Sequence, residues 1–408
     1  MGMLKKSLRL AIAFMTAASA AFLSAGSAPV AAGAVSTGTL FGLAQNTVLK
    51  IDPATGASQT FVNLPTVATF PGSSYNDIAS DAAGHLLFLQ RTVYTQDPTG
   101  LIVTYQIVTV SSSDPNAAPV VSPDMTTGVT QLVFDPSSRT LFAQTNMYPF
   151  QVVSIDPATG VETHVADIPG LQPLFMAAAP NHTIYMPIED FSVWPPVNRI
   201  ATIDTMTGAV SQQPLSMGIF ALEYDSTSGV LYGKTFCCPA AIVQVDPTTG
   251  AETAIASNLG IGPGITIDSS SHRIYMTDDE QGAYSLDQFI QTVDLQGHTS
   301  TKSTGTLPAN QYVGALVFEG VAITPDSIIA DVQGALASGA ISDPGVAGSL
   351  VAKLNAAKAA RLRGQCGAAA AVYQAFINEV DTQSGKAVAA PTASQLVSEA
   401  QSLIANCP

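Results

Sequence analysis

Short runs of alternating apolar and polar residues recur between residues 39 and 318, and each run has the length of a β-strand. One of these runs places an aromatic residue after an aliphatic one, as in Leu141-Phe142. The equivalent aromatic residues are Phe41, Phe88, Phe142, Tyr185, Tyr232 and Tyr275. They lie 43 to 54 residues apart, which is the length of one four-stranded propeller blade. The pattern predicts an all-β, six-bladed propeller.

A second repeat, Asp-Pro-x-Thr-Gly, follows the third strand that we expect in a blade. Its copies are Asp52–Gly56, Asp156–Gly160 and Asp246–Gly250, with a looser copy at Asp204–Gly208. In this motif the Asp side chain can bond its own backbone, Pro presets φ, and Gly adopts the positive φ that closes the turn. Each copy therefore predicts a tight hairpin between the two outer strands of a blade.

The first aromatic strand has no inner strand before it, because residues 35–38 are too few to form one. A strand of suitable pattern, Tyr312–Glu319, follows the last outer strand instead. We expect this strand to become the innermost strand of the first blade, so that the ring closes without an open edge. The predicted propeller spans residues 35–321.

The apolar spacing changes to that of helices after Val321. Thr324 and Pro325 form an N-cap followed by proline at the first helical position. We expect four helices, at about residues 325–339, 345–363, 366–380 and after 391, which would form a small all-α bundle over residues 325–408.

Residues 327–405 resemble the FIMAH domain, a small helical module at the C-termini of bacterial secreted proteins. The matching segments include 329–332, 337–341, 349–357 and 375–380. The resemblance implies a bacterial exported protein and no catalytic residues. The propeller resembles secreted bacterial propellers with Asp-Pro-x-Thr-Gly turns.

The first 34 residues have the pattern of a secretory signal peptide. Lys5, Lys6 and Arg9 precede an apolar run at residues 10–23, and small residues at 32–34 suit cleavage. The run is too short to span a bilayer, and no later stretch of the sequence is long and apolar enough to do so. We therefore expect an extracellular or periplasmic protein.

The formal net charge of −15 argues against nucleic acid as a partner, because phosphate binding needs a basic face. Two pairs of cysteines suit an oxidising compartment. We expect a disulfide between Cys366 and Cys407 in the bundle, and the adjacent Cys237 and Cys238 can form a vicinal disulfide. Neither pair has the spacing of a zinc site.

The sequence contains none of the common nucleophile or metalloprotease motifs. His85, His182 and His272 share one repeat position, in the turn after the innermost strand. Equivalent turns are distributed around a ring and cannot converge on a substrate, so we expect these histidines to be solvated turn residues.

The long connections between the second and third strands share one face, and function on a rigid scaffold usually lies on such variable loops. The candidate ligand residues on this face are Tyr94, Tyr148, Glu189, Asp190, Trp194, Asp278, Asp279 and Tyr284. They favour a non-catalytic scaffold that binds a protein or a glycan without a cofactor.

The alternative is a Ca²⁺-dependent propeller enzyme of the lactonase or lyase type. In that case Glu223, which interrupts an apolar strand pattern, and Asp77 would be the metal candidates near the pore.

Overall fold

The structure is a computed structural model of the whole chain. It describes residues 38–67, 71–97, 100–168, 172–190, 197–235, 240–279, 287–307, 312–320, 325–363 and 365–405. The predicted signal peptide, Trp194, Cys237, Cys238, Tyr284 and Cys407 lie outside these residues.

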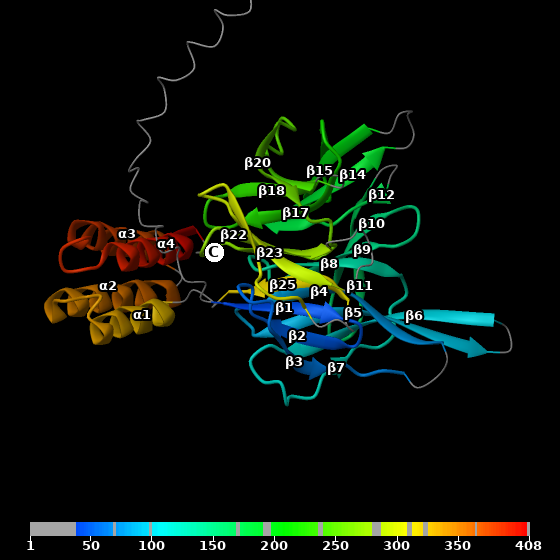
Figure 1. Cartoon of the computed structure of the whole chain (residues 1–408), viewed down its shortest axis with the longest axis horizontal. Coiled ribbons are helices and arrows are strands. Elements are labelled where there is room, and N and C mark those ends of the chain that lie inside the picture. The colour runs from blue at the N-terminus through cyan, green and yellow to red at the C-terminus, as the bar shows by residue number, and fades with distance from the viewer. Residues whose placement is uncertain are drawn as a thin grey trace, which may run out of the picture. The chain divides into compact units, whose positions relative to one another are not determined.

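Six antiparallel sheets form the propeller (Figure 1). Blade 1 contains β25 (Val313–Glu319), β1 (Thr39–Ala44), β2 (Thr47–Ile51) and β3 (Ser58–Asn63). Blade 2 contains β4 (Pro71–Asp81), β5 (Leu86–Asp97), β6 (Gly100–Ser111) and β7 (Val120–Val121). Blade 3 contains β8 (Val129–Asp135), β9 (Thr140–Thr145), β10 (Gln151–Ile155) and β11 (Glu162–Asp167).

The other three blades follow the same order from the axis outward. Blade 4 contains β12 (Gln172–Pro173) and β13 (Ala177–Ala179), which both pair with β14 (Thr183–Asp190), then β15 (Val197–Asp204) and β16 (Val210–Pro214). Blade 5 contains β17 (Ile219–Asp225), β18 (Val230–Thr235), β19 (Ala240–Val245) and β20 (Glu252–Leu259). Blade 6 contains β21 (Ile265–Asp268), β22 (Arg273–Asp279), β23 (Gln288–Asp294) and β24 (Thr299–Lys302).

The predicted ring closure is confirmed. β25 pairs with β1 in an antiparallel register in which Thr39 lies opposite Glu319 and Gly42 opposite Leu316. The innermost strand of blade 1 therefore comes from the end of the propeller sequence, and the other three strands come from its beginning.

Aromatic contacts join neighbouring blades. Phe88 of blade 2 stacks on Phe134 of blade 3 with ring centroids 5.6 Å apart. Tyr275 of blade 6 packs on Phe318 of blade 1 at the same separation. In both pairs the repeated aromatic residue of a second strand meets the innermost strand of the next blade. Tyr185 of blade 4 meets Tyr224 of blade 5 in the same way, so the repeated aromatic residue makes this contact in three of the blades.

The Asp-Pro-x-Thr-Gly turns form as predicted. The carboxylate of Asp52 accepts hydrogen bonds from the Ala54 backbone N–H at 2.9 Å and from the Thr55 hydroxyl at 2.8 Å. Gly56 has φ +73° and donates its N–H to the Asp52 carbonyl. A Cβ on Gly56 would lie 2.3 Å from the carbonyl oxygen of Gly305, which follows blade 6. The turn glycine therefore supplies both the conformation of the hairpin and a close approach to the neighbouring blade.

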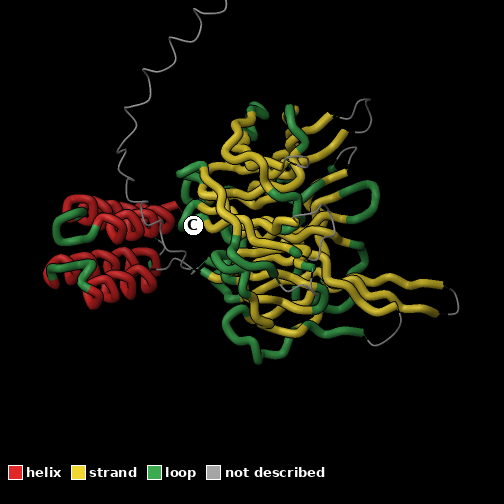
Figure 2. Tube along the Cα trace, in the orientation of Figure 1, coloured by secondary structure: helices red, strands yellow, loops and turns green. Residues whose placement is uncertain are grey.

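The four predicted helices are confirmed as α1 (Pro325–Ser338), α2 (Pro344–Leu362), α3 (Cys366–Gln383) and α4 (Ala390–Ala405), drawn in red in Figure 2. Their shared core includes Leu350, Leu354, Tyr373 and Phe376, which are fully buried. Cys366 is not a free thiol, and its pairing with Cys407 remains a prediction. Within the described residues, no helix has the length and apolar character needed to cross a membrane.

Candidate functional site

The innermost strands of the six blades surround a small cavity on the propeller axis. Its volume is about 60 Å³, which is room for a few water molecules. The lining residues come from every blade and are Asp77, Ile78, Gln131, Leu132, Phe175, Met176, Leu222, Glu223, Pro263, Gly264, Ile265, Ala315 and Leu316. This set contains two carboxylates and an amide but no basic side chain. The two metal candidates from the sequence, Asp77 and Glu223, therefore line one cavity.

A β-bulge lies beside the cavity in four of the blades, and in three of them the bulged strand carries a polar lining residue. The register shifts between Tyr75 and Asp77 in β4, between Val129 and Gln131 in β8, and between Ile219 and Ala221 in β17. A bulge leaves one residue unpaired and re-aims the side chains that follow it. These three strands carry Asp77, Gln131 and Glu223.

Asp77 is held in place by two backbone donors. Its Oδ1 accepts from the N–H of Ile78 at 2.9 Å, and its Oδ2 accepts from the N–H of Leu132 in the next blade at 2.7 Å. Burial raises the pKa of Asp77 to about 7, although both hydrogen bonds act in the opposite direction. The carboxylate is therefore oriented by the fold, and each oxygen keeps a lone pair for a further contact.

Glu223 keeps part of its surface open to the cavity. Desolvation in the channel, with a smaller contribution from the nearby Asp77 carboxylate, raises the pKa of Glu223 to about 8. Gln131 is 8% exposed, and its Oε1 has no hydrogen-bond partner. The cavity thus gathers carboxylate and amide oxygens that the described side chains do not neutralise. No group of three His, Cys, Asp or Glu side chains suited to a metal occurs among those residues.

The predicted ligand face is divided between exposed and buried residues. Tyr148 is 74% exposed, Tyr94 and Glu189 are half-buried, and Asp190 ends β14. Asp278 and Asp279 are buried instead. Asp278 forms an ion pair with Lys302 at 3.1 Å.

The side chain of Lys234 is almost completely buried close to Asp278 and Asp279. Its Nζ donates to the carbonyl of Gly262, next to the cavity-lining Pro263. Burial lowers the pKa of Lys234 to about 8, while the two aspartates favour its charged form. Gln288 donates to Asp279 at 2.9 Å. The two aspartates therefore belong to a buried network at the rim and not to its open surface.

A long hairpin of β5 and β6 projects from blade 2 (Figures 1 and 2). Each of its strands has 12 residues, against six in β18 and β19 of blade 5. At the tip of β6, Leu101, Ile102 and Val103 are 53%, 42% and 37% exposed. Tyr94 lies opposite Val103 across the hairpin. Tyr94 was a candidate from the sequence, whereas the three aliphatic residues were not.

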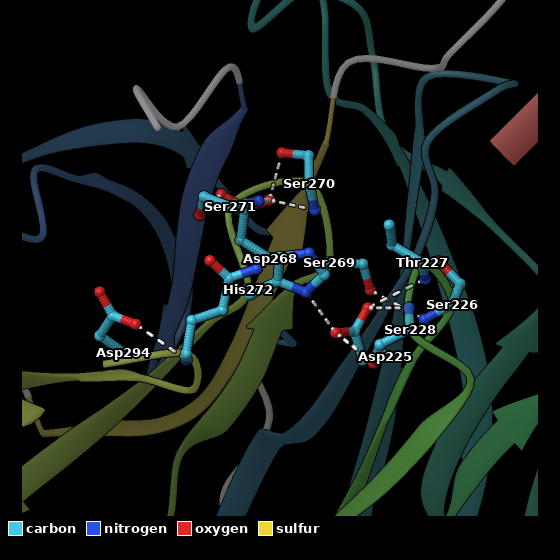
Figure 3. A network of polar contacts seen from close by, with 11 residues as sticks. Asp225, Ser226, Thr227, Ser228, Asp268, Ser269, Ser270, Ser271, His272 and Asp294 are labelled. Atoms are coloured by element: carbon cyan, nitrogen blue, oxygen red, sulfur yellow. Dashed lines mark hydrogen bonds and ion pairs between the residues drawn. The ribbon is translucent and has the colours of Figure 1, made fainter. Parts of the chain in front are cut away.

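The histidine turns also differ from expectation. His85 has a side chain that is 58% exposed, as expected of a solvated turn residue. The expectation is wrong for His272, whose side chain is 19% exposed and whose Nδ1 lies 2.7 Å from Oδ2 of the buried Asp225 (Figure 3). Asp225 also accepts from Ser228 and the Thr227 backbone (Figure 3). His272 therefore joins blade 6 to blade 5.

The same connection recurs around the ring. Arg139 of blade 3 contacts Asp81 of blade 2 at 2.5 Å. In each contact the acid is the last residue of an innermost strand, and the basic residue directly precedes the second strand of the next blade. Blade 4 has Ala179 in place of the acid, opposite Thr183, and blade 5 has Gly229 in place of the basic residue.

Blade 5, whose neighbour blade 4 offers no acid at this position, has no turn histidine or arginine. Blade 1 has none either, since Gly38 precedes β1, although blade 6 offers Asp268. The contacts of His272 and Arg139 show that these two turns contribute to the contact between blades.

We expect His272→Asn to cost about 1–2 kcal/mol of unfolding free energy at pH 5.5 and less at pH 9. The hydrogen bond to Asp225 raises the pKa of His272, so its stabilising effect is complete below the ordinary value near 6.5 and declines as the pH passes the raised one. Urea unfolding across this pH range measures the difference.

The matched control is His85→Asn, whose ring lies 4.0 Å from Glu319 and is largely exposed. We expect this variant to differ from the parent by less than about 0.5 kcal/mol. Equal costs for the two variants at every pH would contradict the interpretation.

Comparisons with known proteins match one family model and several solved structures. Residues 325–405 match the family model of the FIMAH domain. A search of curated proteins finds no match. TolB from Acinetobacter baumannii is similar over 69% of this chain and 66% of its own, with 10% identity and a TM-score of 0.49. A protein described as a TolB from Agrobacterium tumefaciens is similar over 65% of this chain and 88% of its own, with 12% identity and a TM-score of 0.46.

The GH74 enzyme of Niastella koreensis is similar over 66% of this chain and 46% of its own, with 15% identity and a TM-score of 0.42. Likenesses at these levels carry no argument about activity or partners.

Proposed function

We propose that the chain is an exported, non-catalytic binding protein that presents the β5–β6 hairpin to a protein partner. The observation that carries the proposal is the exposed aliphatic tip of this hairpin, residues 101–103. Exposed apolar groups that adjoin one another are a common mark of interaction surfaces. Export is supported by the N-terminal sequence and by the FIMAH match.

One face of the hairpin forms an apolar strip. Directly opposed residues of antiparallel strands share a face, and residues two apart on one strand do too. Tyr94 lies opposite Val103, and Leu101 is two residues from Val103. Tyr105 continues the strip toward the blade. The strip therefore combines aliphatic and aromatic surface, which suits apolar side chains of a protein better than the hydroxyl groups of a glycan.

The outer edge of β6 offers backbone groups beside this strip. Within the described residues, β6 pairs outward only through Val108, Thr109 and a single bridge from Tyr105. An edge of this kind can accept an extended segment as a further strand. We therefore propose a partner that contributes an extended, apolar segment.

The enzyme alternative has less support. The axial cavity of about 60 Å³ is much smaller than the roughly 300–1,000 Å³ of typical small-molecule sites. Two observations favour it: Asp77 and Glu223 line the same cavity, and burial raises the pKa of both carboxyl groups.

Site-specific photo-crosslinking in the producing bacterium tests the proposal. A photoreactive residue in place of Val103, on the apolar strip, should give a discrete adduct with one other protein. The matched control is Met206, which is 72% exposed and lies in the β15–β16 turn, at the opposite end of the strands. We expect no adduct from position 206.

Two results would contradict the proposal. Equal labelling of the same proteins from positions 103 and 206 would indicate non-specific contact. The absence of any adduct from positions 101, 102 and 103 would exclude the hairpin tip as a docking surface.

A further inference from the structure

The axial cavity is lined by oxygen atoms that suit a cation, and none of its lining side chains is basic. Asp77 and Glu223 contribute carboxylates, and the other lining groups are apolar side chains, backbone and Gln131. Two acids alone do not define a site. The second observation is the orphaned Oε1 of Gln131, since an unpaired buried acceptor costs about 1–3 kcal/mol unless a ligand or water satisfies it.

We propose that the axial cavity binds one Ca²⁺ ion through the carboxylates of Asp77 and Glu223 and the amide oxygen of Gln131. The three side chains come from blades 2, 5 and 3, so the ion would join separate blades at the axis. This site is independent of the β5–β6 hairpin and of the function proposed for it.

The donor chemistry favours Ca²⁺ over other metals. All three side-chain donors are oxygens, which hard cations prefer, and the cavity lining includes no histidine or cysteine. Ca²⁺ accepts irregular coordination and backbone carbonyls, whereas Mg²⁺ demands near-octahedral geometry. The two backbone hydrogen bonds that fix Asp77 are the kind of outer contact that orients a metal ligand.

Isothermal titration of the metal-free, full-length protein with CaCl₂ tests the proposal. We expect one site per chain with a Kd of about 10⁻⁴ M, in the range of extracellular calcium modules. Saturating Ca²⁺ should raise the Tm of the propeller by about 2–4 °C. Mg²⁺ should bind at least about tenfold more weakly.

Three variants locate the site. Glu223→Gln should weaken Ca²⁺ binding by at least about tenfold and abolish the Tm shift, because it removes one of two charges. Gln131→Leu keeps a similar size without the oxygen and should weaken binding about three- to tenfold. Asp114→Asn removes an exposed acid that does not line the cavity and should leave the Kd within about twofold.

Each variant is first checked for a parent-like melting curve without Ca²⁺, and Gln131→Leu remains informative if Glu223→Gln does not fold. Binding that survives both cavity variants, that is lost in Asp114→Asn, or that is absent up to about 20 mM Ca²⁺ would overturn the proposal.

Discussion

Gly250→Ala is expected to destabilise the propeller by about 3–4 kcal/mol and to lower its Tm by roughly 5–7 °C. Gly250 closes the β19–β20 turn with φ +74°, where an alanine costs about 1–2 kcal/mol. Its added Cβ would also lie 2.0 Å from the Pro214 carbonyl oxygen of blade 4. Because that contact is with backbone, it can be relieved only by moving two blades apart. Thermal and urea unfolding measure the change.

Gly229→Ala separates the two effects. Gly229 has φ +73°, but the nearest atom to its added Cβ is the Tyr224 hydroxyl oxygen at 3.6 Å, which is ordinary contact. We expect a cost of about 1–2 kcal/mol from the backbone conformation alone. If both variants lose equal stability, the close approach between blades has no energetic weight.

Phe376→Ala is expected to unfold the helical module at a temperature about 15–30 °C below that of the parent, while the propeller melts as before. Phe376 is fully buried among the four helices, and truncation of such a side chain costs about 3–5 kcal/mol. The prediction rests on the proposed division into a propeller at 35–321 and a helical domain at 325–408. Calorimetry combined with circular dichroism at the helical band follows each transition.

Val372→Ala is the matched control on the same helix. Val372 is only partly buried, and we expect a loss of about 1 kcal/mol or less. A single transition that falls for both parts in Phe376→Ala would contradict the division, because it would show that they unfold as one unit.

The propeller could be predicted because its evidence is local and repeated. Each Asp-Pro-x-Thr-Gly turn specifies a hairpin by itself, and the missing inner strand before Phe41 pointed to β25. The long β5–β6 hairpin was indicated less clearly. The interval from Phe88 to Phe142 is the longest of the five between repeated aromatic residues, which suggests an insertion in this blade. Nothing in that interval, however, shows which residues project from the blade.

The channel could be predicted only in part. Asp77 and Glu223 were named from the strand pattern, but their approach depends on bulges, which break the two-residue alternation that assigns faces. Gln131 was missed. Its position could have been found from Asp77. Asp77 lies four residues before Asp81, which ends β4, and Gln131 lies four residues before Asp135, which ends β8.

The ring closure has a consequence for synthesis. β25 is the last strand of the propeller to be made, so until residue 319 is complete blade 1 consists of β1, β2 and β3 only. The edge of β1 that β25 covers, with Leu40 and Phe41, is then available for wrong pairing. A chain that ends early lacks both this cover and the closed ring. The native propeller is thus reached only by nascent chains that have been made almost to the helical module.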